Sequence, residues 1–347
     1  MTYPEAEQIA ALVDDATTIL IVQADNPDAD SLGSALALEN IMNDLGKIPI
    51  LYCGVDIPDY LHYLPGWDRV SSELPVDFDL SIIVDASTYT LFEKLSLQGG
   101  IQTLVRRPSI VLDHHRNVQS PLDFASIMIC DDQVASAGEL IYHIAGNCNW
   151  PIEIAGGEMI MASILGDTQG LTNDLARATT YRVMAELIDK GVERPRLEEA
   201  RREVGKMVQE IYRYKAILLG RTEFAHDGCI AHVTITQDEI SRYSQLYNPG
   251  PLVQPDMMQV RGVHLSIVFK SYDDGKVTAS IRAGSGYGIA GDLATFMGGG
   301  GHAYAAGFKI TNGKSFEAIR QECLQEASRL LGNLTTPEDI TTRAYSV

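Results

Sequence analysis

Apolar and polar positions alternate along the first 190 residues in a pattern that predicts strands followed by helices. Four short apolar runs, rich in Ile, Val and Leu, are expected to be buried strands: 17–23, 47–53, 79–87 and 108–115. Three segments with apolar residues at helical spacing are expected to be helices: 34–46, 135–146 and 153–167. This alternation predicts right-handed crossovers and a doubly wound, mainly parallel sheet with helices on both faces.

The pattern changes in the second half of the chain. Residues 194–221 are charged and carry a helical apolar stripe, so we expect one connector helix there. Strand candidates, a glycine-rich segment and a last helix follow at 230–236, 263–270, 276–284, 284–308 and 315–331. The predicted fold class is α/β, with a first domain, a linker, a smaller mixed-sheet α/β domain and a tail at 1–190, 191–221, 222–332 and 333–347.

The chain of 347 residues is strongly acidic. It has 27 Lys and Arg against 46 Asp and Glu, which gives a formal net charge of −19. Because Lys and Arg contacts to phosphates supply most non-specific nucleic-acid affinity, this charge excludes a protein that wraps around long DNA or RNA. A small phosphorylated substrate, held by metal or in a local positive pocket, remains compatible with it.

The five cysteines are widely spaced and include no CxxC pair. An odd, scattered set argues against a disulfide framework and a structural zinc site, and is typical of free thiols in a reducing cytoplasm. The acidic N-terminal segment lacks a secretory signal pattern, and no run approaches the roughly 18 apolar residues of a membrane helix. We therefore expect a cytoplasmic protein that does not contact a membrane.

Polar side chains that could bind a metal follow the predicted strands and one predicted helix. They form four clusters: Asp28 with Asp30, Asp85, Asp113 with His114 and His115, and Asp167. The crevice outside the carboxyl ends of the strands is the usual ligand position in an open α/β sheet, and three of the clusters reach it. Each cluster alone has an ordinary alternative, such as a helix N-cap at Asp30 or a strand-end pair at His114 and His115.

Taken together, the clusters favour a metal centre. Four carboxylates close together would repel one another and have raised pKa values, which bound cations would prevent. Two divalent cations about 3.5–4 Å apart can share a carboxylate, activate a water and stabilise in-line displacement at phosphorus. A site made mostly of oxygen with some imidazole suits Mn²⁺ best and Mg²⁺ next.

Five motifs in order connect these residues to a known family. DNPDADSLGS, VDAS, LDHH and GDTQG resemble the four motifs of the DHH phosphoesterase superfamily. GGGGHAYAAGF resembles the glycine-rich signature of the DHH-associated domain in its oligoribonuclease (nanoRNase) and pAp-phosphatase-like branch. The resemblance extends over about residues 18–311, and it implies a substrate site in the cleft between the two domains.

The resemblance implies a role for each residue of the metal centre. Asp28 would ligate one metal and Asp30 the other, and Asp85 would bridge both. His114 and Asp167 would complete the second metal site.

Further roles follow from the same resemblance. His115 would lie beside the substrate phosphate as a general acid or electrostatic stabiliser, and Asp113 would orient a ligand. Arg282 would hold another phosphate of the substrate. The substrate-binding turn would consist of Gly299, Gly300, Gly301 and His302, although a flexible loop is the alternative for the glycine run alone.

One position departs from the family pattern. The family usually has a His four residues before Asp28, where this chain has Ala24. Asp25 and Asn26 are candidates for a replacement ligand, with Gln23 close behind, and water is another. We expect the second metal to bind normally and the first to bind weakly or through altered ligands.

The predicted function is hydrolysis of short nucleotide substrates by in-line attack of a metal-held hydroxide. Candidate substrates are di- and oligoribonucleotides, linear or cyclic dinucleotides, and 3′-phosphoadenosine 5′-phosphate. The alternative is a nucleotide-binding protein whose catalysis is impaired by Ala24. The charged run 198–206 is expected to be a solvated helix face, with a homodimer contact as the other interpretation.

Overall fold

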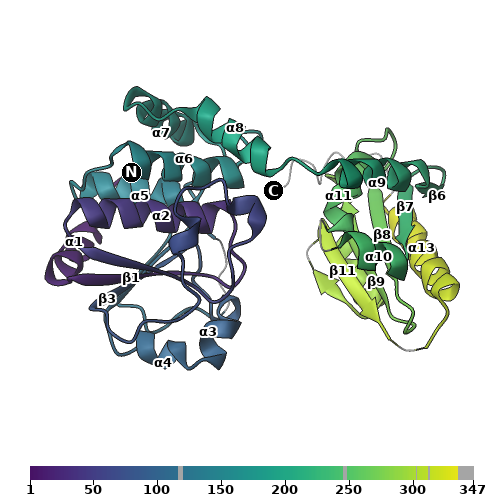
Figure 1. The fold of residues 1–347 in the computed structure, drawn as a ribbon, viewed down its shortest axis with the longest axis horizontal. Helices are drawn as coiled ribbons and strands as arrows, with labels where there is room; N and C mark the ends of the chain where they lie inside the picture. Colours follow the sequence, from purple (N-terminus) through teal and green to yellow (C-terminus); the bar gives the residue numbers. More distant parts are fainter. Residues whose placement is uncertain (116–119, 245–247, 302, 312, 335–347) are drawn as a thin grey trace. The chain divides into compact units, whose positions relative to one another are not determined.

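The computed structural model describes residues 1–115, 120–244, 248–301, 303–311 and 313–334. The chain divides into two units, Met1–Lys206 and Met207–Val347 (Figure 1). Most of the expected tail, from residue 335 onward, lies outside the described residues. Each unit is built around its own sheet.

The first unit alternates strands and helices, as the apolar pattern predicts. Its elements in chain order are α1 (Ala6–Asp15), β1 (Thr18–Gln23), α2 (Ala29–Asp44), β2 (Ile48–Cys53), η1 (Asp59–Leu61), η2 (Trp67–Arg69), β3 (Leu80–Val84), η3 (Tyr89–Leu91), α3 (Glu93–Leu97), α4 (Gly100–Leu104), β4 (Ser109–Asp113), β5 (Ile127–Cys130), α5 (Ala137–Asn147), α6 (Ile154–Asp167), α7 (Ala178–Asp189) and α8 (Arg194–Val204).

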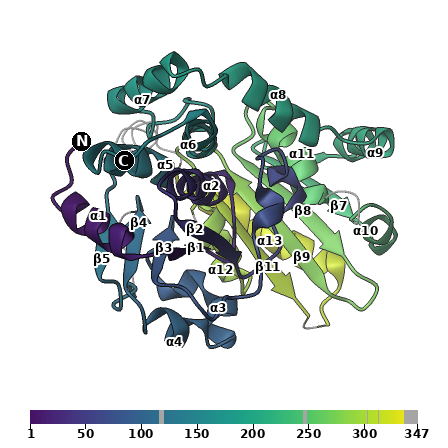
Figure 2. The same ribbon diagram turned by 60° about the vertical axis from the view of Figure 1, so that its left-hand side comes forward.

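The five strands of this unit form one parallel sheet in the order β2-β1-β3-β4-β5. The strand order reverses between β1 and β3, so the crossovers that leave these two strands diverge. Such a switch point, at the carboxyl ends of the strands, is where open α/β sheets bind ligands. Helices α2, α5 and α6 cover one face of the sheet, and α3 and α4 lie on the other (Figures 1 and 2).

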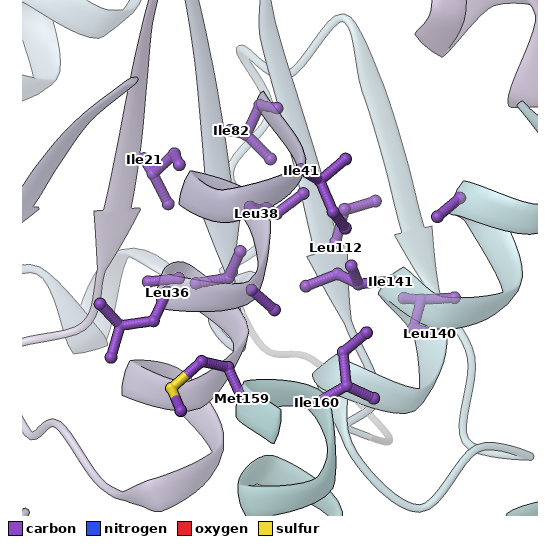
Figure 3. Packing of buried hydrophobic residues seen from close by; sticks show 14 of the residues in the cluster. Ile21, Leu36, Leu38, Ile41, Ile82, Leu112, Leu140, Ile141, Met159 and Ile160 are labelled. Atoms are coloured by element: carbon purple, nitrogen blue, oxygen red, sulfur yellow. The ribbon is translucent and has the colours of Figure 1, made fainter. Parts of the chain in front are cut away.

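Apolar side chains fill the space between the sheet and α2, α5 and α6. Ile21, Ile82 and Leu112 point from three neighbouring strands toward Leu38 and Ile41 of α2 (Figure 3). All five side chains are at most 2% exposed to solvent. Burial of an aliphatic side chain contributes roughly 1.5–3 kcal/mol, so this layer fixes α2 over the switch point.

The second unit has a mixed sheet in the order β10-β11-β9-β8-β7-β6, in which only the β7–β8 pairing is parallel. Its elements are α9 (Gln209–Gly220), β6 (Glu223–Ala225), β7 (Ile230–Ile235), α10 (Gln237–Tyr243), α11 (Pro249–Met258), β8 (Leu265–Ser271), β9 (Val277–Ala283), α12 (Ala290–Phe296), β10 (Gly300–Gly301), β11 (Ala305–Ile310) and α13 (Phe316–Gly332). The expected α/β fold class with a second, mixed sheet is therefore confirmed.

The prediction of one connector helix over 194–221 is wrong. The segment forms α8 and α9, with an extended stretch between them around Val208. Gly205 follows the last residue of α8, and glycine costs about 1 kcal/mol relative to alanine in a helix. The boundary between the two units falls at this break.

Within α8, Arg201 pairs with Glu198, and Lys206 just beyond the helix pairs with Glu203. Both ion pairs join residues three positions apart, so they follow a charged face of the helix. No helix among the described residues is both long and apolar enough to cross a membrane.

Helices α2 and α6 approach each other closely at Gly33. A Cβ at this position would lie 2.8 Å from the carbonyl oxygen of Met159, a contact that requires the helices to move apart. We therefore expect Gly33→Ala to lower the free energy of unfolding by about 1–3 kcal/mol, as overpacked core substitutions do. Denaturant unfolding followed by circular dichroism measures the change.

The matched control is Gly156→Ala on α6. Its new Cβ would make an ordinary 3.5 Å contact with Asn40, and the better helix propensity of alanine predicts a gain of up to about 1 kcal/mol. Equal stability of the two variants would contradict the close helix contact.

Candidate metal centre

Asp28 and Asp30 lie at the start of α2, where the chain leaves β1. Asp28 is the N-cap: its Oδ1 accepts hydrogen bonds from the backbone N–H groups of Asp30 and Ser31, both at 3.0 Å. Its side chain is exposed, and the cap leaves its second oxygen available for a ligand. The N-cap is therefore Asp28 and not Asp30, and α2 begins before the expected residue 34.

Asp30 points inward and is completely buried. Its carboxylate accepts hydrogen bonds from the backbone N–H of Ala137 at 2.8 Å and the hydroxyls of Ser34 and Ser163 at 2.9 and 2.6 Å. Burial alone would raise its pKa, but the interactions with His114, Ser163 and Ala137 lower it to about 2. Asp30 is therefore held as an anion.

Asp85 follows β3 directly and has a φ of 56°, in the left-handed region that few residues with a side chain adopt. Its side chain is buried, and its Oδ1 accepts no hydrogen bond from the described residues. Burial, together with the negative charge of Asp30, raises the pKa of Asp85 well above its ordinary value. An unusual backbone conformation thus holds a buried carboxylate oxygen to which no described residue donates a hydrogen bond.

The Nε2 atom of His114 is the point on which three carboxylates converge. It lies 3.0 Å from Oδ2 of Asp167, 3.3 Å from Oδ2 of Asp30 and 3.5 Å from Oδ1 of Asp85. It is buried and makes no hydrogen bond of good geometry within the described chain. Although burial would lower the pKa of His114, the three carboxylates raise it, so a positive charge is favoured at this point.

Two groups of ligand atoms in this cluster could hold a metal ion. One consists of Asp30, His114 and Asp167, and the other of Asp85, His114 and His115. Carboxylate oxygens and imidazole nitrogens grouped in this way fit a divalent cation, because a cation would offset the negative charge of all the carboxylates together. The residues present therefore fit the metal that the motifs imply.

His115 lies at the edge of the cluster with its side chain 56% exposed. Its Nδ1 is 2.8 Å from Oδ1 of Asp113, whose pairing raises the pKa of His115. The same Asp113 oxygen accepts the backbone N–H groups of His114 and His115, and the other accepts the hydroxyl of Ser87. Asp113 thus fixes the orientation of the His115 ring through its Nδ1 atom.

The structure does not bring the candidate replacement ligands into these groups. Oδ2 of Asp25 accepts the backbone N–H of Lys94 at 2.6 Å, whereas its Oδ1 lies against Gly54, buried and without a hydrogen bond to the described residues. Asn26 is exposed, and Ala24 is buried with its carbonyl oxygen 3.2 Å from the thiol sulfur of Cys53. Gln23 ends β1 fully buried, with neither amide atom hydrogen-bonded to a described residue.

The predicted substrate residues of the second unit lie on neighbouring strands. Arg282 is exposed on β9, level with Ala305 of β11, and Gly300 and Gly301 form β10 on the other side of β11. The flexible-loop alternative is therefore wrong for these two glycines. A Cβ on Gly299 would lie 2.2 Å from the carbonyl oxygen of Gly307, so close packing requires a glycine there. His302 lies outside the described residues.

Sequence reasoning missed the serines that hold the carboxylates. Ser34 follows Asp30 by four residues on α2, a spacing from which its contact could have been anticipated. Ser163 and Ser87 come from other elements and carry no such local signal.

Comparison with known protein families finds one matching family in each of the two units. Residues 18–165 match the DHH family, N-terminal domain, and residues 251–329 match the DHHA1 domain. The bifunctional oligoribonuclease and PAP phosphatase NrnA of Thermus thermophilus is 24% identical over 312 residues, covering 88% of each chain.

Solved structures show the same fold. An exopolyphosphatase-related protein from Bacteroides fragilis has a TM-score of 0.79 at 21% identity, covering 96% of this chain and 100% of that one. RecJ of Thermus thermophilus in complex with Mn²⁺ has a TM-score of 0.51 at 15% identity, covering 95% of this chain and 55% of its own.

The contacts of Asp113 predict a large loss of stability when its side chain is removed. We expect Asp113→Ala to lower the free energy of unfolding by about 3 kcal/mol or more, because several buried donors lose their acceptor at roughly 1–3 kcal/mol each. Ser87→Ala, which removes a single donor, should cost about 1 kcal/mol. Denaturant unfolding compares the two; a loss for Asp113→Ala no greater than for Ser87→Ala would contradict its role.

Proposed function

Because the chain belongs to the DHH superfamily, in the branch that carries a DHHA1 domain, we propose that it is a divalent-metal-dependent enzyme that hydrolyses short nucleotides. The chain is a hydrolase acting on phosphoester bonds, and its metal and substrate are the parts that we propose. The observation that carries the proposal is the convergence of Asp30, Asp85 and Asp167 on Nε2 of His114.

We assign the metal ligands residue by residue. Asp30, His114 and Asp167 would hold the second metal, Asp85 would bridge, and Asp28 would ligate the first. Mn²⁺ is the preferred ion and Mg²⁺ the next, as expected for oxygen-rich ligands with one imidazole. Divalent cations in such a centre polarise phosphoryl oxygens and lower the pKa of water.

The protein residues around the metals would position the substrate and handle its charge. Asp113 holds the ring of the partly exposed His115 through Nδ1, so a protonated His115 could donate from Nε2 to a phosphate oxygen or a leaving group. In the second unit, Arg282 would bind a further phosphate. The backbone beside Gly299, Gly300 and Gly301, together with His302, would contact the substrate.

The proposed substrates are short. NrnA of Thermus thermophilus is named an oligoribonuclease and PAP phosphatase, which supports di- and oligoribonucleotides or 3′-phosphoadenosine 5′-phosphate. The net charge of −19 disfavours long strands, since these need an extended basic surface. Linear and cyclic dinucleotides are also short enough to bind without an extended basic surface.

A second candidate function is nucleotide binding without efficient turnover. It is favoured by Ala24, which supplies no imidazole to the first metal, and by Asp25, whose Oδ2 accepts the backbone N–H of Lys94 and which belongs to neither group of ligand atoms. In that case the second metal would bind tightly and the first would bind weakly.

Hydrolysis of a small substrate panel tests the proposed activity. With Mn²⁺ present, we expect turnover of at least one of pApA, a five-nucleotide RNA, cyclic di-AMP and 3′-phosphoadenosine 5′-phosphate, measured by chromatography of the products. Asp85→Ala should reduce the rate by at least about 100-fold, because metal ligands support most of the rate acceleration. Binding of Mn²⁺ and nucleotide with no turnover on any member would select the binding protein instead.

Calorimetric titration with Mn²⁺ tests the effect of Ala24. We expect one tight and one weak site, and Ala24→His should tighten the weak site by roughly 10–100-fold. Ala24→Leu is the control, since it adds comparable bulk at the same buried position without a metal-binding nitrogen. Two equally tight sites in the unaltered protein would contradict the proposed weakness of the first.

A further inference from the structure

A cavity of about 650 Å³ opens beside the metal centre, with all its lining residues in the first unit. Asp167 of the cluster and the N-cap residue Asp28 line it, as do Tyr60 and Tyr63 near η1 and Leu197 and Arg202 of α8. Its volume lies within the range of small-molecule sites, roughly 300–1,000 Å³. A ligand in this cavity would therefore reach two of the carboxylates that we assign to the metals.

The cavity offers a flat aromatic ring and an apolar wall. Leu197 is buried, and Tyr63 is 8% exposed, so both form a fixed wall. Tyr60 is 58% exposed, and its hydroxyl donates a hydrogen bond to the carbonyl oxygen of Pro27 at 3.1 Å. This bond ties an accessible ring to the residue that precedes Asp28.

Positive charge is available on the same wall. The guanidinium of Arg201 donates to Oε2 of Glu198 at 3.1 and 2.7 Å and is thereby engaged. Arg202 is exposed and makes no hydrogen bond or ion pair with the described residues. Its guanidinium is therefore free to contact an anionic group of a ligand.

We propose that this cavity binds a nucleoside of the substrate, with the base stacked on Tyr60 and the attached phosphate directed toward Asp28 and Asp167. The inference rests on the proposed nucleotide hydrolysis and assigns one subsite to it. Stacking on an aromatic side chain tolerates any base, since every base has a π-face. Arg202 would contact a further phosphate or ribose oxygen of the same nucleotide.

The test uses 2-aminopurine riboside 5′-monophosphate, whose fluorescence is quenched when its base stacks. Titrated in Mg²⁺-containing buffer, it should bind the unaltered protein with quenching. Tyr60→Leu should weaken binding about tenfold or more and abolish the quenching, in line with the effect of removing a stacking residue. Tyr60→Phe retains the ring without the bond to Pro27 and should bind within about twofold of the unaltered protein.

A pair of variants on α8 provides a second measurement. Arg202→Gln should weaken binding of the probe, whereas Arg196→Gln should leave it unchanged, because Arg196 lines a different hollow of the surface. Circular dichroism and Mn²⁺ titration verify that each variant is folded and keeps its metal centre.

The outcomes separate this subsite from the proposed function. Quenching that depends on Tyr60, without hydrolysis of any nucleotide, would support the subsite and contradict the proposed hydrolysis. If the protein hydrolyses a dinucleotide but Tyr60→Leu binds the probe as tightly as the unaltered protein does, the subsite is contradicted and the proposed hydrolysis is supported. Failure of the unaltered protein to bind the probe would also overturn the subsite.

Discussion

Buried negative charge is the constraint on which the first unit depends. Asp30 and Asp85 are both removed from solvent, and a buried carboxylate is costly unless its oxygens are satisfied. Asp30 is satisfied by donors from α2, α5 and α6, whereas Asp85 retains an oxygen without a hydrogen bond. The residual charge is thus concentrated near His114, where a cation would stabilise the folded protein and supply the chemistry.

The sheet topology explains why these charges meet. The strand order places β1 beside β3, so Asp28 and Asp30 after one strand and Asp85 after the other lie at the switch point. Strand β4 delivers His114 to the same edge, and the close contact between α2 and α6 at Gly33 positions the end of α6 with Asp167. The packing of α2 against α6 beside the cluster therefore helps to set its geometry.

Strands β1 to β4 of the first sheet and β7 to β9 of the second could be predicted because their apolar signals are local, whereas β5 was missed. Parallel strands necessarily bring residues after their carboxyl ends to one edge. The contact of Ser163 with Asp30 could not be predicted, since it depends on how α6 packs against α2. The break near Gly205 and the pairing of Gly300 with β11 were missed because glycine-rich or charged sequence is also typical of a solvated helix or a loop.

The two proposed metal positions differ in how firmly the backbone provides their ligands. For the second, Asp30 and His114 are held by buried hydrogen bonds and strand geometry, and Asp167 ends a long helix. For the first, Asp28 already uses one oxygen to cap α2, and Asp25 uses one of its oxygens to accept the backbone N–H of Lys94. The weakness that we propose for the first position therefore arises from the local backbone as well as from Ala24. Since Asp28 also lines the cavity with Tyr60, occupancy of this position and nucleotide binding would share one side chain.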